Sequence, residues 1–453
     1  MPTNLRRTAH AAHLMTSDYY VAREPRNWHF ERSWAALALF LAGHCVFGVV
    51  IHNNPTLATL HALAAAVVSC GIALLSSRLE WVAYSIAYLA GSEVLWRASQ
   101  ANVLWETGKL SVAVVAFCAL IRMRETRLPI PAMLYFLLLL PSMLETYRLW
   151  KIENAMTRWT AFLSGPLALA VCACFFSNCR LTKQQIHQTF LAFILPITSL
   201  WFVASYGTFS KQVQFGSESM AETSGGYGPN QVSAVLGLGG LLLGLYLMQS
   251  SLTIRRKLLI GGLMIAFLAQ SALTLSRGGL YAAFGAMLPA MAFLARDRRS
   301  QLRVLLTVAS VALIGVFIVY PFLDSYTSGA LSRRFADRGM THREQYMISD
   351  LETWLENPIF GVGVGFSQFQ HSNAALNHNE ITRTLAEHGL FGLGALIMMA
   401  IMIFRRILSA RTMEERAQVS ALLTWGVLFV FANGARIAAP SFIIGLAMTR
   451  PRN

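Results

Sequence analysis

One polar stretch of an otherwise apolar chain carries residue types that could do chemistry. It begins T-H-R-E-Q-Y at Thr341, continues through N-P-I-F-G-V-G-V-G and ends in L-N-H-N-E and A-E-H-G-L-F-G at Gly392. A neutral imidazole at His378 could take a proton from a hydroxyl group near neutral pH, as a general base does. Alternatively, His378 only caps a helix or faces lipid headgroups.

Two arginines have the chemistry to bind phosphate. Arg277 lies in L-S-R-G-G between two apolar segments, where a guanidinium is costly unless it is paired, reaches the membrane surface or is functional. Its planar fork suits bidentate phosphate binding. Arg343 falls in the first turn of a predicted helix, where its charge opposes the helix dipole, so an anionic ligand explains it better than helix stability. Membrane anchoring of Arg277 and simple solvation of Arg343 remain alternatives.

A second polar segment, residues 207–229, supplies further candidates. It leads into S-G-G-Y-G-P-N-Q, which predicts a helix beginning at Pro229-Asn230. The free N–H groups of such a helix start can bind an anion, although an ordinary Gly-Pro turn with an Asn cap explains the residues equally well. Lys211 is the basic residue of this segment, and Arg436 near the end of the chain is a weaker alternative.

The elements that must position these residues can also be read from the pattern. Thr341 and Glu344 are spaced as a capping box, which predicts a helix start, and Asn357-Pro358 predicts its end. The glycines that follow, Gly361, Gly363 and Gly365, predict a loop whose backbone can approach a ligand closely.

Composition predicts an all-α, polytopic membrane protein. The chain has 453 residues, of which 55% are hydrophobic and 13% charged, whereas a soluble domain has about 25% charged residues. We expect about 12 to 14 transmembrane helices and one large helical periplasmic loop. The net charge of +15 comes from basic residues scattered through short loops, which fits topology signals and contact with anionic membrane lipids rather than nucleic acid.

The Lys and Arg distribution predicts the orientation, because cytoplasmic loops are enriched in both. We expect a cytoplasmic N-terminal segment at 1–33 without a cleaved signal, and a transmembrane bundle at 34–320 with a periplasmic loop at 207–229. A large periplasmic catalytic loop at 321–387 and C-terminal transmembrane helices with a cytoplasmic tail at 388–453 would follow. Because the periplasm offers no ATP or nucleotide sugars, an enzyme working there needs an already activated donor, such as a lipid diphosphate sugar.

Metal binding and disulfides are not expected. All six cysteines fall in or beside predicted membrane helices, so a disulfide framework or thiolate metal site is not indicated. His342, His371, His378 and His388 share one region but lack the fixed close spacing of a zinc site.

Three acid–base pairs have the helical spacing of ion pairs: Glu93/Arg97, Glu106/Lys109 and Glu145/Arg148.

The polar stretch resembles a known family. His378-Asn379, nine residues and then Gly-x-x-Gly from Gly389 is similar to the signature of the O-antigen ligase and polymerase superfamily of bacterial inner membranes. Arg343 ahead of N-P-I-F-G-V-G-V-G, and S-R-G-G from Ser276 to Gly279, are two further parts of that pattern. The resemblance covers roughly residues 225–396.

The resemblance implies a metal-independent, cofactor-free glycosyltransferase of the ligase type in lipopolysaccharide biosynthesis. It would transfer O-antigen polysaccharide from undecaprenyl diphosphate to a sugar hydroxyl of lipid A-core, with His378 as general base. Arg277, Arg343 and Lys211, with Asn379 and Asn230, would bind the diphosphate. Family members often carry an arginine where only Lys211 is found here, so the basic residue from this loop stays open. Displacement with one base and no covalent nucleophile predicts inversion.

Other functions stay open at this stage. The same motifs occur in O-antigen polymerases and protein O-oligosaccharyltransferases of the superfamily. A transporter for the lipid-linked glycan is the rival from another class, although transporters usually show internal repeats and broken helices, and neither is visible here. Glycan identity and the acceptor hydroxyl are not encoded in these patterns.

Overall fold

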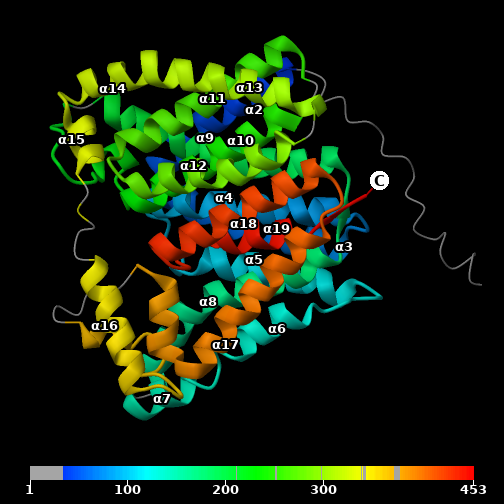
Figure 1. Ribbon diagram of the computed structural model, residues 1–453, viewed down its shortest axis with the longest axis vertical. Helices are drawn as coiled ribbons and strands as arrows, with labels where there is room; N and C mark the ends of the chain where they lie inside the picture. Colours follow the sequence, from blue (N-terminus) through cyan, green and yellow to red (C-terminus); the bar gives the residue numbers. More distant parts are fainter. Residues whose placement is uncertain are drawn as a thin grey trace, which may run out of the picture. The chain divides into compact units, whose positions relative to one another are not determined.

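The computed structural model describes residues 34–150, 152–210, 212–249, 252–296, 298–337, 339, 343–371 and 378–452, which are almost entirely helical (Figure 1). The chain divides into two compact units, Met1–Phe40 and Leu41–Asn453. Helix α2 (Trp34–His52) runs across this boundary. The second unit contains every candidate site residue.

The first half of this unit contains α3 (Pro55–Leu75), α4 (Leu79–Ala98), α5 (Thr107–Arg122), α6 (Ile130–Leu137), α7 (Met143–Leu149), α8 (Ile152–Ser177), β1 (Arg180–Leu181), α9 (Lys183–Ser210), η3 (Glu222–Ser224) and α10 (Pro229–Gln249). The second half contains α11 (Ile254–Leu273), α12 (Arg277–Leu294), α13 (Arg298–Ile314), η4 (Gly315–Val319), α14 (Tyr320–Tyr326), α15 (Ala330–Ala336), α16 (Arg343–Glu356), η5 (Ser367–Gln370), α17 (Glu380–Ser409), α18 (Met413–Asn433), α19 (Ala438–Ala447) and β2 (Arg450–Pro451). The strands β1 and β2 form one short parallel pair, with Arg180 opposite Arg450.

Eight helical stretches of the described chain are long and apolar enough to cross a membrane. They are Trp34–His52, Pro55–Leu75, Ile152–Ser177, Lys183–Ser210, Pro229–Met248, Ile254–Leu273, Gln301–Tyr326 and Glu380–Ser409. The all-α, multi-span prediction is confirmed, whereas a total of about 12 to 14 crossings stays a prediction. Helix α19 has 10 residues, which are too few to cross a bilayer core alone.

Glycines let the central helices approach closely, as small residues do in membrane bundles. A Cβ added to Gly237 of α10 would lie 2.4 Å from the Gly279 carbonyl oxygen of α12. A Cβ added to Gly279 would in turn lie 2.2 Å from the Ser233 carbonyl oxygen of α10. Helix α18 packs on α12, and α19 packs between α18 and α8 (Figure 1). These contacts hold the first turns of α10 and α12 beside the last turn of α18.

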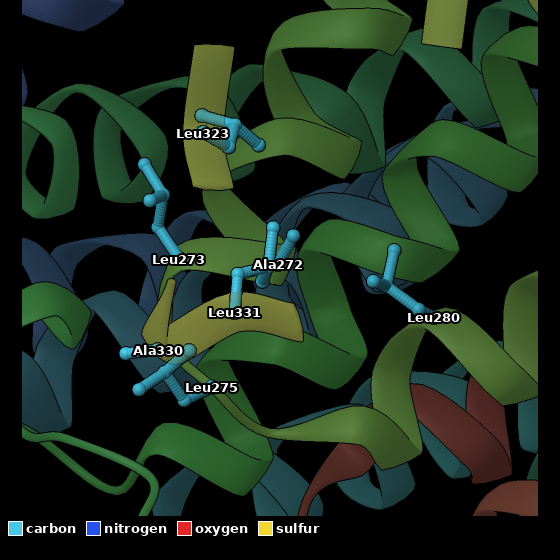
Figure 2. Close-up of a cluster of buried hydrophobic side chains, with 7 residues drawn as sticks. All are labelled: Ala272, Leu273, Leu275, Leu280, Leu323, Ala330 and Leu331. Atoms are coloured by element: carbon cyan, nitrogen blue, oxygen red, sulfur yellow. The ribbon is translucent and has the colours of Figure 1, made fainter. Parts of the chain in front are cut away.

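A buried apolar cluster anchors α14 and α15 on the turn between α11 and α12 (Figure 2). Leu323 of α14 and Leu331 of α15 pack there against Leu273 and Leu275. The turn itself is tight, since Leu275 has a positive φ of 54°. The cluster therefore fixes α15 beside Ser276 and Arg277, the start of α12.

Two of the three predicted ion pairs form. Arg97 Nη2 lies 2.5 Å from Glu93 Oε1, and Arg148 Nη1 lies 2.7 Å from Glu145 Oε1. Lys109 instead donates to the Ala161 carbonyl of α8 at 3.3 Å, because its side chain is buried against that helix.

Candidate active site

A cavity of about 490 Å³ lies at the start of α12 and brings together residues that are far apart in sequence. Its lining comprises Asn230, Ser276, Arg277, Gly278, Tyr281, Ala282, Arg334, Phe335, Asp337, Gly339, Leu428, Phe431, Ala432 and Asn433. One side is polar and basic, and the other is apolar, with Tyr281 and Phe431 exposed. We name it the Arg277 cavity. Two of the sequence-predicted residues, Arg277 and Asn230, line it.

Arg277 is the first residue of α12 and holds the segment after α15 through main-chain carbonyls. Its Nη1 donates to the carbonyls of Arg334, at 3.4 Å, and Asp337, and its Nη2 donates to Gly339 O at 2.9 Å. No carboxylate in the part of the chain that the structure describes pairs with it. Because carbonyls are neutral, they orient the guanidinium without neutralising its charge.

Arg334 is a second guanidinium of the same cavity, which the sequence analysis did not single out. Its Nε donates to the Leu275 carbonyl at 3.1 Å, so it is oriented by the same turn that precedes Arg277. Its Nη1 lies 3.6 Å from Asp337 Oδ2, a loose ion pair whose acid is half-exposed. With Arg277 unneutralised, the cavity carries a net positive charge and suits an anion. The only sequence signal was the cluster of arginines at 333, 334 and 338.

Asn230 confirms the predicted helix start, since α10 begins at Pro229. Its Oδ1 accepts a hydrogen bond from Ser276 Oγ at 2.7 Å, which ties the first turn of α10 to the residue before Arg277. Asn230 is thus held at the edge of the cavity. Whether its amide contacts a ligand stays a prediction.

His378 is half-buried and lies directly before α17, while Asn379 caps that helix. The Asn379 Oδ1 accepts from Ile381 N–H at 2.9 Å, so this oxygen satisfies the helix start. Asn379, and not His378, therefore caps this helix. The cap also explains why α17 begins at Glu380, eight residues before the predicted span at 388.

Glu380, which forms a buried ion pair within α17, also joins the His378 segment to the loop between α18 and α19. Glu380 Oε1 lies 2.5 Å from Arg383 Nη2, and its Oε2 accepts from Ala435 N–H at 2.9 Å. A Cβ added to Gly434 would lie 3.8 Å from the His378 carbonyl oxygen. Asn433, one residue earlier, lines the Arg277 cavity, so the His378 carbonyl lies next to a neighbour of the cavity lining, whereas His378 itself does not line the cavity.

Two further candidates are described only in part or not at all. Arg343 begins α16, but its side chain lies outside the described residues. Gly339 lines the cavity, and the four residues from there to Arg343 can span at most about 14 Å, so Arg343 starts near it. Lys211 and Thr341 lie outside the described residues. Arg436 belongs to the α18–α19 loop, where its carbonyl accepts from Arg97 Nη2 at 3.1 Å.

The glycine loop meets protein, not an open site, which corrects the expectation of close ligand approach. Gly361, Gly363 and Gly365 all have positive φ, at 70°, 94° and 72°. A Cβ on Gly361 would lie 2.3 Å from the Glu387 carbonyl carbon of α17. On Gly363 it would lie 2.8 Å from Thr146 N of α7, and on Gly365 2.6 Å from the Phe162 ring of α8.

The Gly-x-x-Gly element provides the α17 side of the contact with this glycine loop. Gly389 has a φ of 57° and breaks α17. A Cβ added to Gly389 would lie 2.7 Å from Gly361 N. The next residue, Leu390, donates its N–H to Pro358 O at 2.7 Å. Glycines of both motifs therefore let the loop after α16 pack closely against α17.

We expect Gly361→Ala to destabilise the protein strongly. The substitution places a Cβ inside the van der Waals radius of Glu387 at a positive φ, and strained backbone alone costs about 1–3 kcal/mol. Thermal unfolding in detergent should occur at a clearly lower temperature. Gly262→Ala is the matched control, because a Cβ there meets nothing within 4 Å. Equal unfolding temperatures for the two variants would contradict this close contact between Gly361 and α17.

Two histidines of this region, His371 and His388, have separate partners. His371 Nε2 lies 3.0 Å from Asp350 Oδ1, and His388 Nδ1 lies 2.5 Å from Ser142 Oγ. Within the described ranges, no three His, Cys, Asp or Glu side chains form a group that could hold a metal ion. Metal independence itself stays a prediction.

A known protein family matches the part of the chain that contains the candidate site. The family model described as O-Antigen ligase matches residues 262–397, which include Arg277, Arg343, His378 and both glycine motifs. No curated protein matches the chain. The matched region begins in α11 and ends within α17, so it covers the arginine side of the cavity and the His378 segment.

Proposed function

We propose that this multi-pass bacterial membrane protein is an O-antigen ligase. The match over residues 262–397 supports membership in the O-antigen ligase superfamily, and the proposal proceeds from it. It would transfer O-antigen polysaccharide from undecaprenyl diphosphate to a sugar hydroxyl of lipid A-core. It would act in the inner membrane with its site facing the periplasm.

The Arg277 cavity is the observation that carries this proposal. Two guanidiniums, Arg277 and Arg334, face a cavity whose opposite side is apolar and exposed at Tyr281 and Phe431. A lipid diphosphate has the matching chemistry, since its anionic head suits the guanidiniums and its isoprenoid chain suits apolar side chains in contact with lipid. Charge that develops on the leaving diphosphate would be stabilised by the same guanidiniums.

His378 would act as the general base on the acceptor hydroxyl. Its backbone lies beside Gly434, one residue from the cavity-lining Asn433, and the neighbouring Glu380 binds Ala435 N–H, which supports this role. A base on one side of the anomeric carbon and a bound diphosphate on the other favour direct displacement with inversion. The hydroxyl proton passes to the imidazole, the new glycosidic bond forms, and undecaprenyl diphosphate leaves.

Reconstitution in nanodiscs with an undecaprenyl diphosphate glycan tests the function directly. Two acceptors are compared, lipid A-core and a second lipid-linked glycan. Transfer to lipid A-core supports the ligase, whereas chain extension on the second lipid identifies a polymerase. Transfer to neither, combined with movement of the donor between leaflets of a vesicle, would favour a transporter and overturn the proposal. Transfer to a protein acceptor would identify the oligosaccharyltransferase alternative.

We expect the α16 region to lie outside the cytoplasm. Glu352 is exposed on α16, so Glu352→Cys in a background without native cysteines should react with a membrane-impermeant maleimide on intact cells. Glu125→Cys, in the Arg-rich connection between α5 and α6, is the control that should react only after permeabilisation. The reverse labelling pattern would contradict a periplasmic site.

We expect transfer to survive exhaustive chelation. If His378 and the arginines supply the base and the charge stabilisation, no divalent ion is needed. The initial rate after EDTA treatment and desalting should match that of the untreated enzyme. Loss of activity with rescue by one divalent ion would show that this division of roles is wrong.

A further inference from the structure

A second cavity, of about 420 Å³, lies beside the connection between α4 and α5. Its volume falls in the range of small-molecule sites, about 300–1,000 Å³. We propose that it binds one neutral sugar ring of the glycan, with Trp105 as the stacking surface and Gln100 and Asn102 as hydrogen-bonding groups. This inference rests on the glycosyltransferase function proposed above.

The ion pair beside this cavity is neutral overall, because Glu93 and Arg97 carry opposite charges, although Arg97 Nε has no hydrogen-bond partner in the described part of the chain. Both Glu93 oxygens are used, Oε1 by Arg97 and Oε2 by Ala438 N–H at 2.5 Å. Arg97 also donates to Gln231 Oε1 at 2.9 Å and to the Trp105 carbonyl at 2.7 Å. A cavity lined by a self-neutralised pair suits a neutral ligand, in contrast with the basic Arg277 cavity.

Trp105 lines this cavity, and the Arg97 guanidinium covers part of its ring. The Arg97 guanidinium lies 4.3 Å from the ring centroid and Tyr227 packs at 5.9 Å, so the indole is held in place. Trp105 nevertheless remains 53% exposed. The negative face of an indole attracts the polarised C–H groups of a sugar ring, and it also provides apolar contact area.

Polar side chains beside the indole are available to a ligand. Gln100, Asn102 and Thr107 line the cavity, and their side chains make no hydrogen bond with another residue of the described segments. Gln100 has a φ of 53°, although it is not glycine. A strained backbone conformation of this kind is often found at binding sites. Amide groups that both donate and accept are suited to sugar hydroxyls.

The two cavities flank the same helix start. Asn230 lines the Arg277 cavity, and the next residue, Gln231, accepts the hydrogen bond from Arg97. On the other side, Asn433 lines the first cavity, and the Arg436 carbonyl accepts from Arg97. A glycan that reacts at the Arg277 cavity can therefore place a sugar a short distance from its reacting end beside Trp105.

Binding of water-soluble oligosaccharides to the full-length protein in nanodiscs tests this inference. Two probes are titrated by calorimetry, the core oligosaccharide released from lipid A and an O-antigen fragment released from its carrier. We expect one of the two probes to bind the wild type. Its affinity for Trp105→Ala should be lower by about tenfold or more, and its affinity for Trp105→Phe should be within a few-fold of that for the wild type. The probe that responds identifies whether the cavity holds the acceptor or the donor glycan.

Trp81→Ala is the matched control, since Trp81 is a part-exposed indole at the opposite end of α4. It should bind the probe as the wild type does. If neither probe binds the wild type, or if Trp105→Ala and Asn102→Ala bind as the wild type does, the sugar site is overturned.

The transfer assay in the same nanodiscs separates this result from the proposed function. Trp105-dependent sugar binding without any transfer by the wild type counts against the ligase function alone. If the wild type transfers glycan but Trp105→Ala binds the probe as well as the wild type does, only the sugar site in this cavity is contradicted. In an active enzyme, Trp105→Ala should raise the KM for the responding substrate more than it lowers kcat.

Discussion

Replacing His378 with alanine is expected to abolish glycan transfer, with a loss of about 10²–10⁴-fold, the usual contribution of a general base. Donor binding should stay close to that of the wild type, because in the proposed mechanism the imidazole acts on the acceptor hydroxyl and arginines bind the diphosphate. Because His378 is only partly buried, removal of its ring should cost less stability than removal of a core side chain. Initial rates and donor affinity are measured on the same nanodisc preparation.

Asn379→Ser tests the residue next to His378 in the same preparation. The serine hydroxyl can keep the cap that Asn379 Oδ1 now provides to Ile381 N–H, so α17 should begin normally. Near-normal transfer by Asn379→Ser would assign Asn379 to capping, whereas weaker donor binding would support the predicted diphosphate contact. Near-normal transfer by His378→Ala would contradict the base.

Local sequence signals predicted the elements of this site well. Pro229-Asn230 predicted the start of α10, and Asn357-Pro358 predicted the end of α16 at Glu356. Such signals work because they depend on backbone groups within one or two turns, which neighbouring residues satisfy. Arg277 was identifiable since a guanidinium between two apolar segments is costly without a purpose.

Tertiary contacts explain what the sequence could not reveal. Arg334 reaches the cavity only because Leu323 and Leu331 anchor α14 and α15 on the α11–α12 turn (Figure 2). Asn433 reaches it because α18 packs along α12. The positive φ of Gly361 could be anticipated from the residue type, but its partner on α17 depends on the packing of segments that are distant in sequence.

Replacing Arg277 with alanine is expected to weaken donor binding by tenfold or more and to reduce turnover. Charge-assisted hydrogen bonds contribute about 1.5–3 kcal/mol each, and about 1.4 kcal/mol corresponds to tenfold in affinity. The variant also releases the Asp337 and Gly339 carbonyls, so the segment after α15 loses its attachment to α12. Donor affinity and initial rate are measured with undecaprenyl diphosphate glycan in nanodiscs.

The lysine variant separates the charge of Arg277 from its role as an attachment point. Arg277→Lys keeps a positive charge but loses the planar fork that reaches three carbonyls at once, so we expect partial recovery of donor binding. Arg333→Ala is the matched control, because Arg333 is exposed, donates to the Ser328 carbonyl and does not line the cavity. It should bind donor within about twofold of the wild type, as surface substitutions usually do. If Arg277→Ala bound donor as well as Arg333→Ala does, the diphosphate would have to lie elsewhere. The cavity would then be only the place where α15 is fastened to the membrane helices.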